Sequence, residues 1–360
     1  MMSRYRTATA VAVSVIAMAA TVSGAAAADT KALAEFYKGK TITVHFGGGV
    51  GGSYWLYSQL AASHLGRFIP GNPNMVIQAM PGSGGIKGLN YSFNVAPRDG
   101  SFITMAHAEV LQETILNPKS KFHAGKYEWV GRFTNIDSIG VASKASGVTS
   151  LDVAMKREVN VGATGMRSWT GFAPMLFNRV AGTKFRVVAG YKGASVMFQA
   201  LDQREIDVAP VSWVAASVGH AAKLKSGEYI PIFAIALKRM PQLPNVPTIT
   251  EFGRDEGEKL FLKVFAANGM IGRALAAPPG TNAERVQALR EAFDRMLADK
   301  QFRDYVASKR IPLNPMSGTE LGKDVASVLA MEPAQIEKTR AVYNEMLEEI
   351  KTKKPAAAKK

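Results

Sequence analysis

Short runs of apolar residues alternate with helix-like segments along most of the chain. The run TITVHF (41–46) is predicted to be a buried strand, and the segment at 54–69, with Leu56, Leu60 and Leu65 near one face, is predicted to be a helix. The same order recurs, and strands are predicted at 41–46, 75–80, 101–106, 158–164, 184–191, 207–213 and 229–237. This alternation is typical of a mainly parallel α/β sheet.

The last third of the chain has a helical pattern instead. An apolar stripe that includes Leu289 and Phe293 predicts one helix, and a further helix is predicted over 333–350. Residues 351–360 are basic and of low complexity, so we expect a flexible tail there.

The strands fall into two sets, which predicts an α/β protein with two lobes. We expect lobe 1 to be discontinuous, with residues 29–142 and 238–350, and lobe 2 to contain residues 143–237. Ligands of such sheets bind outside the carboxyl ends of the strands. A cleft between the lobes is therefore the expected ligand site.

The N-terminus has the pattern of a secretory signal peptide. Arg4 and Arg6 precede an apolar core at 8–20, and a run of small residues ends at Ala28. That core is shorter than the roughly 20 residues that a membrane-spanning helix needs. We therefore expect residues 1–28 to be removed and the protein to reach the periplasm.

Composition narrows the chemistry further. The chain of 360 residues has no cysteine, which excludes disulfides, thiolate metal sites and a lipid anchor on cysteine. Its formal net charge is +15. An exported protein rarely meets nucleic acid, so we expect no nucleic-acid partner; the charge fits either attraction of small anions or a solvated surface.

The segment Gly47–Gly52 matches the G-x-G-x-x-G pattern of dinucleotide-binding loops. That fingerprint also needs an acidic residue about 20 positions on, and none occurs between Gly52 and Asp99. A P-loop would continue with Gly-Lys-Ser or Gly-Lys-Thr, whereas Ser53-Tyr54 follows here. A tight turn without a ligand remains one interpretation, and general anion capture remains the other.

Anion capture is favoured by a second glycine loop at 81–85, after the next predicted strand. Glycines let the backbone approach a ligand, and free N–H groups at the first turn of a helix attract negative charge. Two such loops side by side could hold a carboxylate between them.

Other catalytic patterns are missing from the sequence. No G-x-S-x-G motif occurs, and no two histidines have metal-ligand spacing; the five histidines are His45, His64, His107, His123 and His220. We therefore expect no catalytic residue, no metal and no cofactor. The alternative is an exported oxidoreductase or hydrolase that uses the glycine loop for a nucleotide or an anionic substrate.

Several motifs in order resemble one receptor family. MPGSGGIKGLN (80–90), VAPRDGSFITM (95–105), AGYKGASVMFQAL (189–201) and LAAPPGTNAERVQAL (275–289) are similar to segments of the receptors of tripartite tricarboxylate transporters, the Bug or TctC-like proteins. The resemblance covers about 35–350. It implies a two-lobed, type II periplasmic-binding-protein fold with a cleft for a small organic carboxylate. It also implies a membrane transporter as partner, and we expect the receptor to be a monomer.

The resemblance and the residues beside these loops predict the ligand-binding positions. They are Gly47, Gly48, Gly49, Gly51, Gly52, Ser53, Tyr54, Gly82, Ser83, Gly84, Gly85, Thr164, Gly165, Arg167, Ser168, Tyr191, Lys192 and Gly193.

One departure from the family bears on the ligand. Many relatives have Thr-Asp after the first glycines, where this chain has Ser53-Tyr54-Trp55. An acidic side chain that could pair with a ligand amine is missing there, which makes amino-acid ligands less expected. Tyr54 and Trp55 instead predict an aromatic wall for an aromatic or apolar carboxylate. Arg167 or Lys192 could hold a second acidic group.

Overall fold

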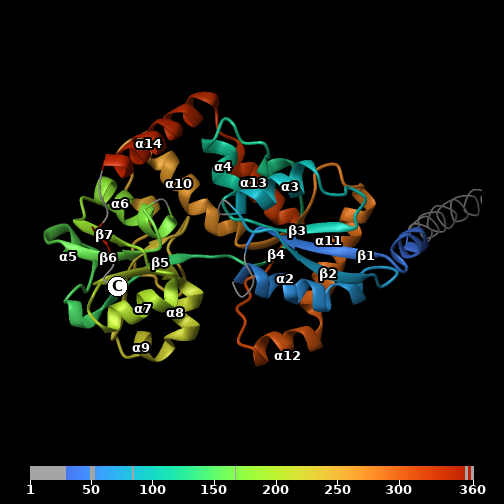
Figure 1. The fold of residues 1–360 in the computed structure, drawn as a ribbon, viewed down its shortest axis with the longest axis horizontal. Coiled ribbons are helices and arrows are strands. Elements are labelled where there is room, and N and C mark those ends of the chain that lie inside the picture. Colours follow the sequence, from blue (N-terminus) through green and yellow to red (C-terminus); the bar gives the residue numbers. More distant parts are fainter. Residues whose placement is uncertain (1–29, 49–52, 83–84, 167, 353–355, 358–360) are drawn as a thin grey trace, which may run out of the picture.

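The computed structural model has two lobes, each built on a six-stranded sheet (Figure 1). It describes residues 30–48, 53–82, 85–166, 168–352 and 356–357. The predicted signal peptide lies outside the described residues. The two-lobed α/β fold that the sequence predicted is confirmed.

The first sheet has the strand order β11-β4-β10-β3-β1-β2. Its strands are β1 (Thr41–Phe46), β2 (Asn74–Ala79), β3 (Phe102–Ala106), β4 (Glu128–Thr134), β10 (Arg273–Ala277) and β11 (Met316–Ser317). β1 pairs in parallel with β2 and β3, as expected, but β10 is antiparallel to both β3 and β4. The difference arises because β10 enters the sheet from the second lobe and not through a helical crossover from its neighbour.

The second sheet has the order β12-β7-β6-β8-β5-β9. Its strands are β5 (Ser138–Ser143), β6 (Val159–Ala163), β7 (Phe185–Ala189), β8 (Val208–Ser212), β9 (Tyr229–Ile235) and β12 (Ala356–Ala357). β6 is parallel to β7 and β8, whereas β5 is antiparallel to β8 and β9. Because β5 begins at Ser138, the chain crosses between the sheets at residues 135–137.

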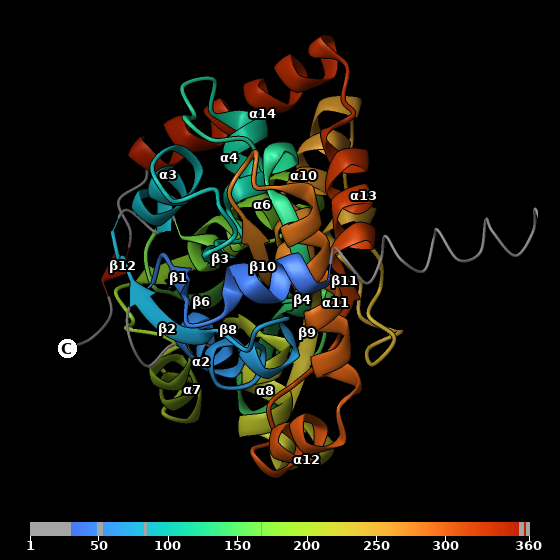
Figure 2. The ribbon, with the colours of Figure 1, turned by 90° about the vertical axis from the view of Figure 1, so that its right-hand side faces the viewer.

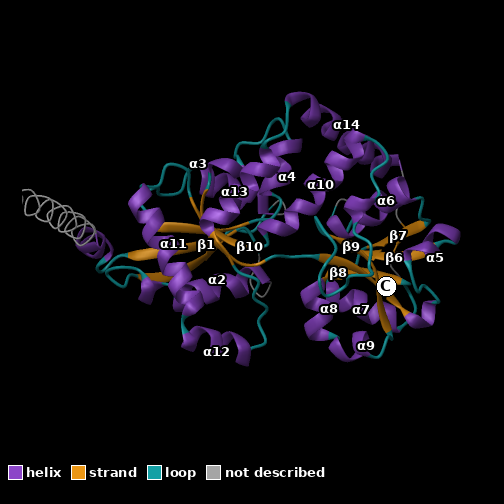
Figure 3. Cartoon of the chain, turned by 180° about the vertical axis from the view of Figure 1, so that it is seen from behind, coloured by secondary structure: helices purple, strands orange, loops and turns teal. Residues whose placement is uncertain are grey.

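Helices cover both sheets (Figure 3). Those of the first lobe are α2 (Ser53–His64), α3 (Ile86–Asn94), α4 (Val110–Leu116), α11 (Ala283–Ala298), α12 (Lys300–Ser308) and α13 (Gly318–Leu329). Those of the second are α5 (Leu151–Lys156), α6 (Trp169–Ala181), α7 (Ala194–Asp202), α8 (Trp213–Gly219) and α9 (Ala221–Lys225). Within the part of the chain that the structure describes, no helix has the length and apolarity to cross a membrane.

Two helices connect the lobes, α10 (Glu256–Ile271) and α14 (Pro333–Thr352). They pack against each other, and α14 runs over the top of the molecule (Figures 1 and 2). One buried apolar cluster contains Leu111 of α4, Phe172 of α6, Phe265 of α10 and Met346 of α14. The lobes therefore share a hydrophobic core along this side. Residues 351–352, which we assigned to the tail, are the last two of α14.

A buried carboxylate reinforces this junction. Glu258 of α10 is 1% exposed, and its oxygens accept from Arg179 Nε of α6 at 2.9 Å and from Arg254 Nη2 at 2.5 Å. Arg179 also pairs with Glu345 of α14 at 2.8 Å. Hydrogen bonds from Arg254 outweigh burial and lower the pKa of Glu258 to about 2.

The stability that Glu258 contributes should depend on pH. A carboxyl whose pKa is lower in the folded than in the unfolded state stabilises the fold above the unfolded pKa, and this contribution is lost as the pH falls from about 4.5 to about 2. Because Arg254 is 60% exposed, solvent screens part of the interaction, and we expect Glu258→Gln to lower the free energy of unfolding by about 2 kcal/mol at pH 7. Urea unfolding at a series of pH values would measure this.

The control is Glu345→Gln, because Glu345 pairs with the same Arg179 but is 60% exposed. That variant should lose less than about 1 kcal/mol. A difference between wild type and Glu258→Gln that persists below pH 2 would contradict the assignment of this stability to ionised Glu258.

Candidate functional site

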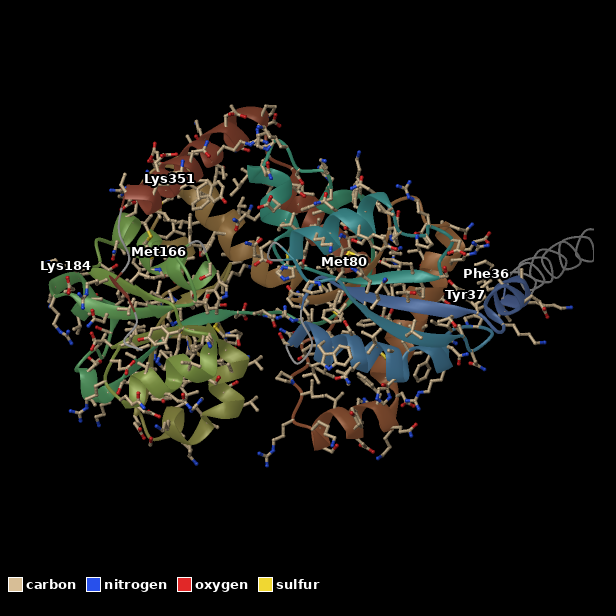
Figure 4. All side chains as sticks on the ribbon, in the orientation of Figure 1. Phe36, Tyr37, Met80, Met166, Lys184 and Lys351 are labelled. Carbon is tan, nitrogen blue, oxygen red and sulfur yellow. The ribbon has the colours of Figure 1, made fainter. Side chains whose placement is uncertain are left out.

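A cavity of about 630 Å³ lies between the lobes. Figure 4 labels Met80, which directly follows β2 in the first lobe, and Met166, which lies three residues after β6 in the second. The cavity is lined by side chains from both lobes and from α10 and α14. The lining residues used below are Tyr54, His107, Glu109, Gln112, Glu113, Ser168, Trp169, Phe172, Ile235, Phe265, Asn268, Arg273 and Tyr343.

Arg273 is the arginine among the described residues that line this cavity. It opens strand β10 and is 8% exposed. Its Nε and Nη2 donate to Ser53 Oγ at 3.2 and 2.6 Å, and Nη1 donates to the Gly272 carbonyl at 2.9 Å. Within the described residues the guanidinium makes no ion pair. Burial lowers the pKa of Arg273, but a guanidinium stays protonated at neutral pH.

Tyr54 holds Arg273 in place. The guanidinium carbon lies 3.7 Å from the centre of the Tyr54 ring, and the His107 ring stacks on Tyr54 with centroids 4.4 Å apart. The Tyr54 hydroxyl accepts from the Ala108 N–H at 2.9 Å. Burial raises the pKa of Tyr54 to about 12, so its hydroxyl stays protonated at neutral pH. Tyr54, which we predicted as part of an aromatic wall, lines the cavity, and its ring also contacts Arg273 and His107; contact with a ligand stays a prediction.

Other elements supply further aromatic surface to the cavity. Trp169 and Phe172 of α6, Phe265 of α10 and Tyr343 of α14 line it, together with Ile235 of β9. An apolar body of a ligand would be buried against these side chains.

Helix α4 brings acidic groups to the same cavity. Glu109 directly precedes α4 and Glu113 lies one turn on, and both line the cavity. Glu109 pairs with His107 Nδ1. Burial by itself would raise the pKa of Glu109. The hydrogen bond and the charge of His107 lower the pKa by more than burial raises it, so the pKa lies below its usual value. Acidic side chains therefore line the cavity although none follows the first glycines, and the expectation that amino-acid ligands are disfavoured stays a prediction.

The described ends of the two predicted glycine loops lie close together. A Cβ on Gly47 would stand 3.0 Å from Gly85 Cα, and one on Gly85 would stand 2.3 Å from the His107 ring. Gly85 has φ +93°, which favours glycine. Gly48 packs by Phe46, and Gly82 lies next to Lys87. The positions Gly49, Gly51, Gly52, Ser83 and Gly84 lie outside the described residues, so carboxylate capture by these loops stays a prediction.

The loop after β6 reaches the cavity through Ser168, the residue before α6. Hydroxyl groups of Thr164, Ser168 and Thr170 hydrogen-bond one another at 2.7–3.0 Å, and Ser168 Oγ donates to the Gly165 carbonyl at 2.7 Å. This network shapes the start of α6. Arg167 lies outside the described residues.

The third predicted group does not line this cavity. Tyr191 is buried in the core of the second lobe, and Gly193 precedes α7 with φ +144°. Lys192 lies between them and is likewise not part of the lining. A role for these three residues in binding stays a prediction.

Sequence reasoning missed Arg273, His107, Glu109 and Glu113. A signal for Arg273 was present, because a single arginine interrupts the apolar run IGRALAA at 271–277. Arginine is almost never fully buried without a partner, so an arginine in a buried strand is a candidate for ligand contact. No comparable local signal marks α4.

A known protein family resembles this chain in sequence, and solved structures resemble it in fold. Residues 69–340, more than half of the chain, match the sequence model of the tripartite tricarboxylate transporter family receptor (TctC). No curated protein matches the chain in sequence.

Among solved structures, a TctC solute-binding protein from Polaromonas without ligand has a TM-score of 0.62 and 17% identity, over 87% of this chain and 99% of that one. MatC from Rhodopseudomonas palustris with bound malate has a TM-score of 0.57 and 21% identity, over 84% and 98%. An R. palustris protein with adipate has a TM-score of 0.57 and 18% identity, over 87% and 97%. At these identities the likeness shows the fold.

The family that the motifs resembled is thereby confirmed. Its model spans the glycine loop after β2, the crossing at residues 135–137, helix α10 and the first part of α14, up to residue 340. The chain belongs to the tripartite tricarboxylate transporter receptor (TctC) family of periplasmic solute-binding proteins.

Proposed function

We propose that this protein is an extracytoplasmic receptor that captures a small organic carboxylate and delivers it to the membrane subunits of a tripartite tricarboxylate-type transporter. One observation carries the proposal: an interlobe cavity of about 630 Å³ contains the buried Arg273, whose guanidinium has no acidic partner among the described residues. This volume is typical of small-molecule sites.

A carboxylate satisfies this cation well. A guanidinium can bind a carboxylate through two parallel hydrogen bonds, and the three contacts of Arg273 to Ser53 and Gly272 leave further N–H donors for a ligand. In this proposal the glycine loops would add backbone N–H groups as further donors to the carboxylate. The malate and adipate in two solved relatives support the same ligand class.

Export and partnership follow from the same proposal. The N-terminal pattern at 1–28 directs the chain to the periplasm, where the receptor acts as a monomer and meets the transporter. The receptor binds its ligand without converting it, and it has no nucleic-acid partner.

Ligand-dependent melting tests the proposal. The exported chain is heated with mono-, di- and tricarboxylates, with amino acids and with nucleotides. A ligand at a hundred times its Kd stabilises the folded state by about 2.7 kcal/mol, so we expect a bound acid to raise Tm by about 5 °C. Stabilisation by a nucleotide and by no carboxylate would overturn the proposal.

A further inference from the structure

Hydrogen-bond acceptors gather at one part of the cavity, along α4 and α10. The Glu113 N–H donates to the Glu109 carbonyl at 2.9 Å, so the two glutamates stand one turn apart on the same side of the helix. Beside them, Asn268 Nδ2 donates to Gln112 Oε1 at 2.7 Å. The Oδ1 atom of Asn268 is buried and has no hydrogen-bond partner within the described part of the chain.

Glu113 is the acidic group in this region without a cation. Its side chain accepts from Asn117 Nδ2 at 2.9 Å, and among the described residues it forms no ion pair. Glu109 differs, because it pairs with His107. The charge of Glu109 acts on Arg273 and raises the pKa of the guanidinium, in opposition to burial. Glu113 lies one turn further along α4.

The cavity therefore has a cation at one place and an unpaired carboxylate at another. Arg273 is buried and forms no ion pair with a described residue, and its contacts to Ser53 and Gly272 leave further N–H donors, which points to a negatively charged ligand group. Aromatic side chains line the space as well, among them Trp169 and Phe172. The faces of such rings attract cations in addition to burying apolar groups.

We propose that the ligand is a zwitterion, with a carboxylate bound by Arg273 and a protonated nitrogen bound by Glu113, on either side of an apolar body. This inference rests on the proposed function and names its ligand class. A second carboxylate in place of the nitrogen would face Glu109 and Glu113, and like charges at a desolvated site oppose binding. Glu113 is then the residue that selects amino acids over di- and tricarboxylates.

Matched pairs of acids test the selection. The pairs are para-(aminomethyl)benzoate with para-methylbenzoate, and δ-aminovalerate with valerate; terephthalate and glutarate represent dicarboxylates. Calorimetry on the exported chain should show that the amino member of a pair binds about tenfold tighter than its partner, which is the effect of a hydrogen bond to a charged group. The dicarboxylates should bind more weakly than either.

Glu113→Gln should remove that tenfold preference and leave the affinity for the deaminated acid within about twofold. The glutamine can still accept from Asn117, so the fold should persist, and circular dichroism would show this. Glu284→Gln is the control, because Glu284 is an exposed glutamate of α11 outside the cavity, and it should leave the preference unchanged.

The outcomes separate the two proposals. If no carboxylate of any kind binds, the proposed function fails. If carboxylates bind but the deaminated acids or the dicarboxylates bind as tightly as the amino acids, the proposed function stands and the zwitterion is wrong. A preference for amino acids that survives in Glu113→Gln would overturn the role of Glu113.

Discussion

Arg273→Gln is expected to weaken the binding of the tightest acid found in the melting screen by about a hundredfold. Glutamine keeps two N–H donors but removes the charge that would pair with the carboxylate in a desolvated site. Arg273→Lys should lose about tenfold, since an ammonium keeps the charge but lacks the planar two-point contact and the stacking on Tyr54. Calorimetry at constant ionic strength would measure both.

Arg285→Gln is a suitable control for this experiment. The Arg285 guanidinium lies 3.6 Å from the centre of the Phe36 ring and donates to the Asp99 carbonyl at 2.8 Å, so it makes the same kinds of contact outside the cavity. Its replacement should leave the affinity unchanged. Wild-type affinity in a folded Arg273→Gln protein would show that the carboxylate binds elsewhere.

Gly272→Ala is expected to reduce stability by about 3 kcal/mol or more and to weaken ligand binding as well. Gly272 has φ +52°, and a Cβ there would stand 2.1 Å from the Thr134 carbonyl oxygen, at the point where the chain crosses between the lobes. The backbone would have to shift, and the Gly272 carbonyl accepts from Arg273, so the guanidinium would shift too. Urea unfolding and calorimetry would measure the two effects.

Gly280→Ala separates the clash from the backbone strain. Gly280 also has a positive φ, of +75°, but a Cβ there would meet nothing within 4 Å. That variant should lose about 1 kcal/mol and keep its affinity. Equal losses of unfolding free energy in Gly272→Ala and Gly280→Ala would mean that the clash with the Thr134 carbonyl oxygen does not destabilise the fold.

Much of the first lobe could be predicted from local sequence. The strand at 41–46 was predicted with its bounds, and the strand at 75–80 was placed one residue from β2. Both are short apolar runs that are followed directly by glycine or proline, so local patterns suffice to place these strands. The helix predicted over 54–69 ends at His64, because Gly66 packs against Pro73 and a short turn of a different helix type follows. The order of motifs also indicated the family.

The contents of the cavity were decided by the tertiary structure. Arg273 meets Ser53 across 220 positions of sequence, and only the antiparallel entry of β10 from the second lobe brings the two together. The local sequence does not distinguish Glu109 and Glu113 from ordinary surface charges. Their place in the cavity follows from the packing of α4 beside α10. Composition, glycine spacing and helical periodicity predict only relations between residues that are close together in the sequence. Which charges share one desolvated space depends on how the lobes are assembled, because that packing joins segments that no local pattern connects.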